Sequence, residues 1–348
     1  MGRTMKAARL HGALDLRLEQ VPEPPAPGPG EVLLAVRAVG LCGSDLHYWT
    51  DGRIGDTPLT DPLIPGHEPA GEVLAVGPGV TGLAPGDRVA IDPALHCGHC
   101  EWCLDGNPNL CPHVRFFGTP PIDGALRERL VHPAEALYRL PDGLDFIDGA
   151  LAEPLGVAVH AVDLAHLRPG QTAAVLGCGP IGLATLLVAR LGGAGPIWAT
   201  DLLAERRATA ARLGADDVFE AADGAAVEAI LAATGGRGVD VVFECATSVQ
   251  TQLEATRVAA IGGCVVLVGI PPEDRFELQH SVARRKGLTV KFARRMRAVY
   301  PRALALAARV ALDLRALATH RFPLEASAAA FELAAAQADG VIKAVVEW

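Results

Sequence analysis

The chain has 348 residues, half of them hydrophobic, and carries 31 basic against 40 acidic side chains, a formal net charge of −9. Its length indicates two domains of ordinary size, and the acidic balance argues against nucleic acid or an anionic membrane as the main partner. No apolar run approaches the ~20 residues that a membrane span needs.

Short β-like runs, broken by Gly and Pro, fill the first third of the chain. They are Glu31–Val39, Gly71–Val76 and Asp87–Ile91. Apolar segments of this length, bounded by turn pairs such as Pro85-Gly86, indicate a compact and mostly antiparallel β domain.

Two segments of this β domain combine side chains that bind metals. They are Cys42-Gly-Ser44-Asp45-Leu-His47 and Gly66-His67-Glu68, and we expect both on loops. Thiolate, imidazole and carboxylate together suit zinc, and a catalytic zinc keeps one position open. Glu153 is a further candidate, because a buried carboxylate needs a partner and a metal supplies one. A helix-capping or ion-paired Glu153 is the alternative.

Four cysteines lie close together in the sequence, at Cys97, Cys100, Cys103 and Cys111. This spacing is typical of a zinc closed by four thiolates, which is a structural site because no coordination position is open. Disulfide pairing is the alternative. Thiols scattered through apolar segments, and the lack of a recognisable secretory signal, favour a reducing environment and a cytoplasmic protein.

From about Pro169 the pattern changes to apolar runs separated by Ala-rich segments of helical period. The runs are Ala173–Gly177, Ile197–Asp201, Val239–Cys245 and Cys264–Gly269. Strands buried on both faces and alternating with helices predict a doubly wound parallel sheet.

The rhythm of strand and helix ends near Thr289, and the stretch from Tyr300 and the closing run Val341–Trp348 are expected to return to the first domain. The predicted fold class is therefore α/β, with a mostly β catalytic domain and a doubly wound nucleotide domain. We expect the catalytic domain at 1–155 and 291–348, including a zinc lobe at 93–113, and the nucleotide domain at 156–290.

A glycine-rich loop, Gly177-Cys-Gly179-Pro180-Ile181-Gly182, follows the first strand of the predicted parallel sheet. Such glycines permit a tight turn and the close approach of a pyrophosphate to the start of the next helix. Pro180 at the first helical position is harmless there. An ordinary strand-to-helix turn is the alternative.

Asp201 ends the next strand, where a carboxylate accepts hydrogen bonds from an adenosine ribose and repels a 2′-phosphate. NAD is therefore expected over NADP. Arg206 lies nearby and could serve a phosphate, but beside Asp201 we interpret it as lying on or near the adenine.

Together these residues resemble the zinc-containing medium-chain dehydrogenases, over essentially the whole chain. Several longer strings are similar to polyol (sorbitol) dehydrogenases in particular: Cys42–Trp49, Gly52–Gly55, Thr119–Gly124, Glu153-Pro-Leu and Thr319–Leu324. The resemblance implies a GroES-like catalytic domain, a Rossmann domain, two zinc ions per chain and NAD. It also implies a homo-oligomer, either a tetramer or a dimer.

The resemblance assigns roles to the metal-site residues. Cys42, His67 and one glutamate, either Glu68 or Glu153, hold the catalytic zinc, while the other glutamate acts directly or through water. Ser44 is similar to the first proton acceptor of the family, and His47 to the group that passes the proton outward. Asp45 would orient His67. A hydride then leaves a secondary hydroxyl of a sorbitol- or xylitol-like polyol for NAD.

Contacts with substrate and coenzyme follow from the same resemblance. The candidates for substrate are Tyr48, Ile54, Phe116 or Phe117, Glu153 and Arg295, and those for the coenzyme are Val268, Gly269, Ile270 and Arg294. The wall residues Tyr48, Ile54 and Phe117 could equally be plain core. The chain departs from the polyol dehydrogenases around Phe292-Ala-Arg294-Arg295-Met296. Of the residues that those enzymes usually show at this point, only Arg295 is kept.

Two other functions are considered. The same zinc chemistry could act on a sugar acid, a cyclitol or a threonine-like amino alcohol. The positive charge of Arg294 would suit an acidic substrate among these. A zinc-stabilised protein that holds the dinucleotide as a redox sensor is the alternative from another class. Such a sensor has no need for Ser44, His47 or Glu153.

Overall fold

The structure is a computed structural model that describes residues 2–271, 275–309 and 313–348. These residues form two compact units, unit 1 at 1–153 and 297–348 and unit 2 at 154–296. The boundaries expected from the sequence, after 155 and after 290, differ from these by two and six residues. Within the described ranges, no helix combines the length and the apolarity that crossing a membrane requires.

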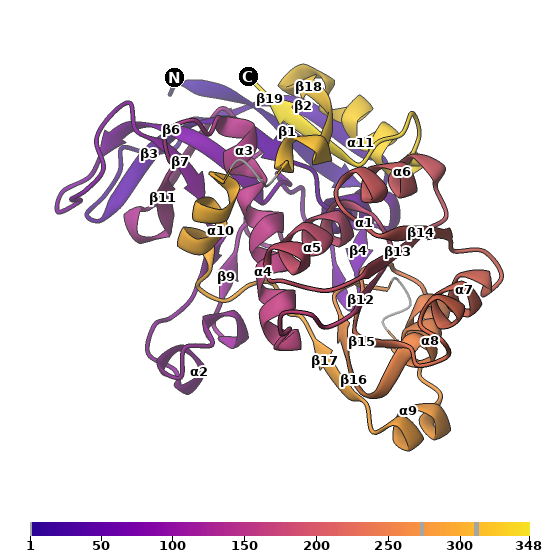
Figure 1. Ribbon diagram of the computed structural model, residues 1–348. Coiled ribbons are helices and arrows are strands. Elements are labelled where there is room, and N and C mark those ends of the chain that lie inside the picture. Colours follow the sequence, from indigo (N-terminus) through magenta and orange to yellow (C-terminus); the bar gives the residue numbers. More distant parts are fainter. Residues whose placement is uncertain (1, 272–274, 310–312) are drawn as a thin grey trace. The chain divides into compact units, whose positions relative to one another are not determined.

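Unit 1 is mostly β (Figure 1). Its strands are β1 (Thr4–Gly12), β2 (Asp15–Pro22), β3 (Glu31–Gly40), β4 (Arg53–Ile54), β5 (Thr57–Pro58), β6 (Glu68–Val76), β7 (Arg88–Ile91), β8 (Ala94–Leu95), β9 (Arg115–Phe116), β10 (Arg129–Pro133), β11 (Leu137–Arg139), β18 (Ala318–Pro323) and β19 (Lys343–Glu347). The seven-stranded sheet has the order β11-β7-β6-β3-β19-β18, with β10 also paired to β3.

The hydrophobic pattern explains the central strand of this sheet. Along β3 the side chains of Val32, Leu34 and Val36 are buried while their neighbours are partly exposed, which is the alternation of a strand with one face in the core. The strand β19 pairs antiparallel with β3, so the closing run of the chain does return to the first domain. The helices of unit 1 are α1 (Gly43–Asp51), α2 (Glu101–Leu104), α3 (Phe146–Ala150), α10 (Tyr300–Ala307) and α11 (Ser327–Ala336), with 3₁₀ turns η1 (Pro108–Leu110), η2 (Ala134–Ala136), η3 (Leu314–Leu317) and η4 (Leu324–Ala326).

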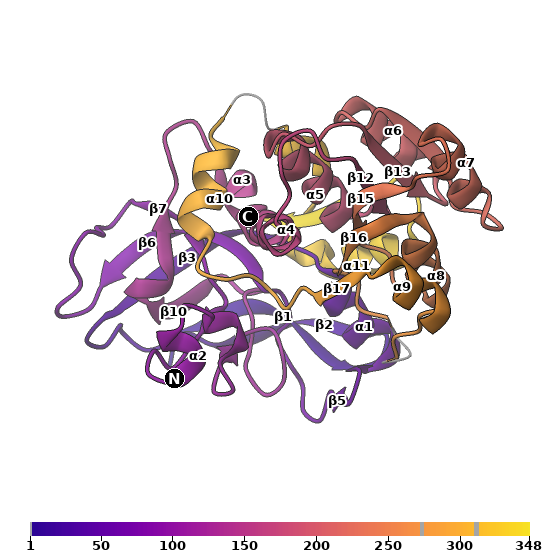
Figure 2. The same cartoon turned by 60° about the horizontal axis from the view of Figure 1, so that its bottom comes forward.

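Unit 2 is a six-stranded parallel sheet between helices (Figure 2). The strands are β12 (Ala173–Leu176), β13 (Ile197–Asp201), β14 (Asp217–Glu220), β15 (Val239–Glu244), β16 (Ala259–Leu267) and β17 (Thr289–Phe292), and the helices are α5 (Pro180–Leu191), α6 (Ala204–Arg212), α7 (Ala225–Ala233), α8 (Val249–Val258) and α9 (His280–Lys286). The helix α4 (Ala152–Ala165) leads from unit 1 into this unit.

In the sheet order β14-β13-β12-β15-β16-β17, the chain adds strands outward from β12 on one side and outward from β15 on the other. The order of connection therefore changes sides between β12 and β15. Because each crossover is right-handed, α5 and α6 cover one face of the sheet and α7, α8 and α9 the other. The loops after β12 and β15 therefore border the crevice in which such sheets bind ligands. From the sequence we expected the alternation of strands and helices to end near Thr289. In the structure the residues from Thr289 to Phe292 form β17, which pairs with β16. The sheet thus continues past the expected boundary.

Candidate metal and dinucleotide sites

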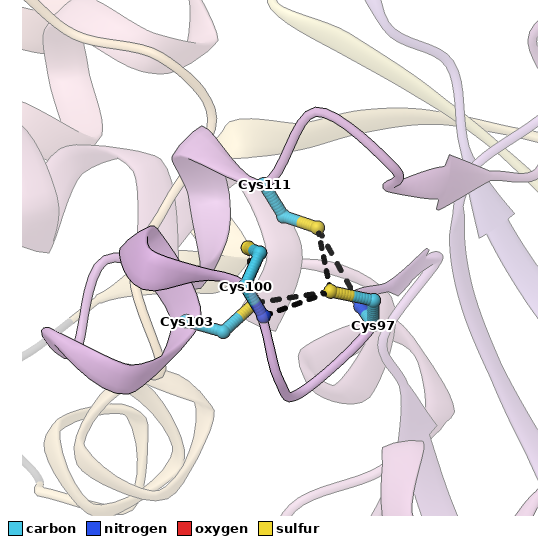
Figure 3. A group of neighbouring side chains, drawn as sticks. All are labelled: Cys97, Cys100, Cys103 and Cys111. Carbon is cyan, nitrogen blue, oxygen red and sulfur yellow. Dashed lines mark hydrogen bonds between the residues drawn. The ribbon is translucent and has the colours of Figure 1, made fainter.

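The four-cysteine lobe is shaped for one metal ion (Figure 3). The sulfur of Cys97 lies 3.6 Å from that of Cys111 and 4.0 Å from that of Cys103, and the Cys100 and Cys103 sulfurs are 3.4 Å apart. Zinc–sulfur bonds of about 2.3 Å place tetrahedral sulfurs about 3.8 Å apart. A disulfide requires about 2.05 Å. All four thiols are free, so the geometry fits zinc and not oxidised pairs.

A second cluster of metal-binding atoms lies deeper in unit 1. One atom each from Cys42, His67 and Glu68 lie within 4.8 Å of one another. The pairing of β3 with β6 produces this arrangement, because Gly40 faces Glu68 in the register and Cys42 follows directly after β3. A thiolate, an imidazole and a carboxylate are the donor set expected for a catalytic zinc. The residues present therefore fit that metal.

Only one of the two candidate glutamates lies in this cluster of metal-binding atoms among the described residues. Among the described residues it contains Glu68, whereas Glu153 lies outside it. Glu153 stands in the first turn of α4 and is 6% exposed. Burial, and then the nearby Glu68 carboxylate, raise the pKa of Glu153 to about 8. A neutral carboxyl group beside the cluster can donate a hydrogen bond to an oxygen held there.

Asp45 organises the loop ends that carry Cys42 and His67. Its carboxylate accepts hydrogen bonds from the Cys42 N–H at 3.0 Å and the Gly66 N–H at 3.1 Å. The same group lies 3.3 Å from Nδ1 of His67, although without the alignment of a hydrogen bond. Burial raises the pKa of Asp45, but His67 and the two N–H groups outweigh it and lower the pKa overall. An ionised Asp45 beside His67 agrees with the orienting role expected for it.

Ser44 and His47 stand on a helix, which corrects the expectation that this segment is a loop. Cys42 is the residue before α1, and both candidates lie in its first two turns. The Ser44 hydroxyl oxygen lies 3.4 Å from Nε2 of His67, and Nδ1 of His47 lies 3.3 Å from Asp51. Residues three apart share one helix face. The helix therefore leads from the buried cluster toward the partly exposed His47.

The side chains expected for the wall of the substrate pocket are buried or partly buried in unit 1. Tyr48 is 1% exposed and Phe117 is 5% exposed, and both pack in the hydrophobic core of unit 1, with Ile54 packed against it. The neighbour Phe116, and not Phe117, places its ring 5.3 Å from the ring of His67. Phe116 is the last residue of β9, whereas Phe117 is the first residue of the turn that follows it.

Sequence reasoning missed one residue at the cluster, Lys343. It is 2% exposed, and its ammonium contacts both carboxylate oxygens of Glu68 at 2.7 and 2.6 Å. A signal was available, because one lysine interrupts the apolar closing run Val341-Ile-Lys-Ala-Val-Val. A charged residue inside a buried strand requires a partner.

In unit 2 the glycine loop is a tight turn in which two positions have no room for a side chain. Gly177 has φ of 92°, and a Cβ there would lie 2.8 Å from the amide nitrogen of Ala246, in the loop after β15. A Cβ on Gly182 would lie 1.8 Å from the carbonyl oxygen of Gly177. Gly179 precedes α5, whose first residues are Pro180 and Ile181. The free N–H groups at this helix start are suited to an anionic pyrophosphate.

Asp201 is tied to the glycine loop as well as placed at a strand end. Its carboxylate accepts hydrogen bonds from the N–H groups of Cys178 at 2.7 Å and Leu203 at 2.9 Å. Each carboxylate oxygen keeps acceptor capacity for a ribose hydroxyl. A guanidinium nitrogen of Arg206 would lie 3.8 Å from a Cβ built on Gly179. Arg206 is therefore beside the glycine loop.

The remaining coenzyme candidates follow the last two strands of the sheet. The N–H groups of Val268 and Gly269 donate to the carbonyl oxygen of Glu244 at 2.8 and 3.0 Å, while Ile270 is 55% exposed. Arg294 and Arg295 follow β17. Arg295 has φ of 51°, a left-handed conformation that is strained for a residue other than glycine and is found most often at functional sites.

Comparisons with known proteins match both units. A model of the alcohol dehydrogenase GroES-like domain matches residues 28–142, and one of the zinc-binding dehydrogenases matches residues 180–309. Sorbitol dehydrogenase from Gallus gallus is 43% identical over 334 residues, 94% of this chain and 92% of that protein. The structure of 2R,3R-butanediol dehydrogenase from Bacillus subtilis has 34% identity and a TM-score of 0.88 over 99% of both chains.

A zinc-binding dehydrogenase from Sinorhizobium meliloti, bound to NADP, has a TM-score of 0.90 and 34% identity over 99% of this chain and 100% of that one. The expected fold class and family are thus confirmed by sequence and by structure. The chain belongs to the zinc-binding medium-chain dehydrogenases, and it is an oxidoreductase that uses zinc and a nicotinamide dinucleotide.

Proposed function

We propose that this dehydrogenase oxidises a secondary hydroxyl of a sorbitol- or xylitol-like polyol with NAD. The observation that carries the proposal is the oxygen-rich character of the cluster, in which Glu68 joins Cys42 and His67 and Glu153 is buried nearby. Relatives named for sorbitol and for a vicinal diol support the same substrate class. We assign Cys42, His67 and Glu68 as ligands of a catalytic zinc and the four cysteines as ligands of a structural one.

Zinc when bound supplies Lewis acidity, which lowers the pKa of an alcohol, and NAD supplies the hydride acceptor. The chain's own residues then have to hold the substrate and remove a proton. Ser44 accepts the proton, since its hydroxyl lies beside His67. His47 passes it to solvent from the outer end of the same helix. Glu153 hydrogen-bonds an oxygen at the site and favours a substrate with a neighbouring hydroxyl.

NAD is the proposed coenzyme, although one similar structure holds NADP. Asp201 is 7% exposed, and its carboxylate accepts hydrogen bonds from two backbone N–H groups that fix its position. A second negative charge, that of a 2′-phosphate, is repelled there. The other residues proposed to contact the coenzyme are Arg206, Val268, Gly269, Ile270 and Arg294.

The substrate assignment is tested by rates with NAD across sorbitol, xylitol, aldonates, amino alcohols, ethanol and propanol. We expect the best polyol to exceed ethanol by at least about a hundredfold in kcat/KM, because a site built to pair hydroxyl groups is left with unpaired polar groups by an analogue that lacks them. Arg295→Ala should remove most of that margin. Arg284→Ala, which changes an exposed arginine of α9, is the matched control. Equal efficiency with simple alcohols would contradict the polyol assignment.

The acidic alternative has one observation in its favour, the positive charge that Arg294 adds next to Arg295. A sugar acid would then be oxidised faster than the matching polyol, and Arg294→Ala would abolish that preference. Cyclitols and threonine-like amino alcohols also belong in the panel, because the same zinc chemistry could oxidise them.

We also propose that the protein is a cytoplasmic homo-oligomer, a dimer or a tetramer. The strand β17 lies at the edge of the six-stranded sheet, and Phe292 on it is 64% exposed. Ile261, on the adjacent strand, is 83% exposed. An open apolar edge of this kind is a site for association between chains. Light scattering of purified protein measures the subunit number, and a monomer would contradict the proposal.

A further inference from the structure

The buried lysine of unit 1, Lys343, has no role in the proposed reaction. Its ammonium donates to both oxygens of Glu68 and to the carbonyl oxygen of Leu41, the latter at 3.0 Å. Leu41 immediately precedes the ligand candidate Cys42. Burying an ammonium ion is costly unless partners of this kind surround it. The three contacts explain how the lysine is accommodated, but they do not explain why a lysine stands there.

The carboxylate that Lys343 holds is the one in the metal cluster. An oxygen of Glu68 lies within 4.8 Å of the Cys42 sulfur and of a ring nitrogen of His67. On another side, a Cβ added to Gly40 would lie 2.1 Å from Oε2 of Glu68. The carboxylate is therefore confined between the backbone of Gly40 and the ammonium of Lys343. A carboxylate has about four lone-pair sites, so two contacts with the lysine leave capacity for a metal.

A purely structural role for the pair is the competing explanation. The pairing of Val345 with Gly40 already joins β19 to β3 without it. Moreover, a buried ion pair is weak evidence for stability, since removing two charges from water offsets most of their attraction. The charged groups that face the lysine are those of the cluster: Glu68 is in direct contact, and Cys42 and Glu153 are near enough to interact with it electrostatically.

We propose that Lys343 is a positioning residue for the catalytic metal. It holds Glu68 in place before the metal binds, but its positive charge repels the metal more strongly than this positioning favours it, so its net effect is to reduce the affinity of the site for zinc. Two cations that share one carboxylate repel each other, and in a low-dielectric interior this repulsion is large. The catalytic zinc thus stays more exchangeable than its buried ligands alone would make it. The inference rests on the proposed assignment of Cys42, His67 and Glu68 as zinc ligands.

The test is zinc affinity, measured by competition with a chelator on protein that keeps its four-cysteine zinc. Lys343→Met removes the charge and keeps the length of the side chain, whereas Lys343→Arg keeps the charge. We expect Lys343→Met to bind zinc at least about tenfold more tightly and to release it more slowly, because the repulsion is gone. Lys343→Arg should stay close to the unmodified protein. Unchanged or weaker binding by Lys343→Met would overturn the proposal.

A second pair of variants keeps the test informative if Lys343→Met fails to fold around its unpaired Glu68. Glu68→Gln removes the buried negative charge, so Glu68→Gln with Lys343→Met has no buried ion in this pair. We expect the double variant to bind zinc more tightly than Glu68→Gln alone. Equal or weaker binding would again overturn the proposal.

The zinc content of Cys42→Ala separates this inference from the proposed function. If Cys42→Ala loses one equivalent and Lys343→Met behaves like the unmodified protein, the inference is overturned and the ligand assignment stands. If Cys42→Ala keeps both equivalents, the ligand assignment is overturned and the inference with it.

Discussion

The two metal sites of unit 1 differ in what surrounds them. In the four-cysteine lobe, Cys97, Cys100 and Cys103 are partly exposed and come from one short stretch of chain. In the mixed site, His67 and Glu68 are buried and meet Cys42 only through the pairing of two strands. Four thiolates would complete a tetrahedron around one zinc, whereas the three mixed donors would leave one position of a bound zinc open. The lobe needs little more than local sequence, and the mixed site needs the whole unit.

The largest effect we expect comes from removing one ligand of the mixed site. Cys42→Ala should lower kcat by at least about a thousandfold, since the loss of several kcal/mol of metal-assisted stabilisation has that consequence. The unfolding temperature should change little, because the strands around the site remain.

The matched variant in the lobe is Cys100→Ser. It should reduce stability toward urea by several kcal/mol, as structural zinc binding contributes directly to folding. Turnover per folded molecule should be retained. A Cys42→Ala enzyme with near-normal turnover, or a Cys100→Ser protein as stable as the unmodified one, would break the distinction between the sites.

Chelation tests the same comparison in the protein without any substitution. The partly exposed lobe would lose its metal first if access alone decided. We expect the reverse, with loss of activity before loss of structure, because the open site exchanges ligands while the closed one does not. Metal analysis and circular dichroism during dialysis against a chelator distinguish the two orders. A single zinc in fully active enzyme would contradict the two-site interpretation.

Unit 2 holds two buried carboxyl groups that we expect to differ in a similar way, Glu244 serving the structure and Asp201 the coenzyme. Glu244 is 1% exposed, and burial, against hydrogen bonds from Thr251 and Ala246, raises its pKa to about 7. The native protein thus holds a proton that the unfolded chain, with a carboxyl pKa of 4.5, has released. The contribution of Glu244 to the free energy of unfolding is fully present below pH 4.5. As the pH rises to about 7 this contribution is lost, which lowers the stability of the protein by up to about 3 kcal/mol.

Glu244→Gln should remove that decline, and urea unfolding at pH 5 and pH 8 measures it. The control is Glu228→Gln, since the Glu228 side chain is 68% exposed. An identical decline in Glu244→Gln and in the unmodified protein would show that other groups cause it.

The smallest effect concerns Asp201. Asp201→Asn removes the charge and keeps one acceptor oxygen. Because the N–H groups of Cys178 and Leu203 donate to different oxygens of Asp201, one of these two hydrogen bonds is lost in the variant. The preference for NAD over NADP in kcat/KM should narrow by about 1–3 kcal/mol. Asp217→Asn, at an exposed position on the edge strand β14, should leave the ratio unchanged. Equal efficiency with both coenzymes in the unmodified enzyme would contradict the proposed role of Asp201.

The sequence by itself determined the features whose geometry is local. The spacing of Cys97, Cys100, Cys103 and Cys111 is enough to predict a shared metal, because a short loop holds all four. The glycines from Gly177 to Gly182 likewise predict a turn and a helix start, and the structure shows both. Strand positions were predictable where apolar runs repeat, and the domain order followed from their change of rhythm.

Only the tertiary structure decided which distant residues meet. It placed Glu68 and not Glu153 among the ligand atoms, turned Phe116 and not Phe117 toward His67, and brought Lys343 to the cluster. The meeting of Glu68 on β6 with Lys343 on β19 depends on strand register, since a shift by one residue turns every side chain to the opposite face. The pairings of Gly40 with Glu68 and with Val345 join segments that lie far apart in the chain. No local pattern encodes such a pairing, because its free energy comes from burial of the assembled sheet.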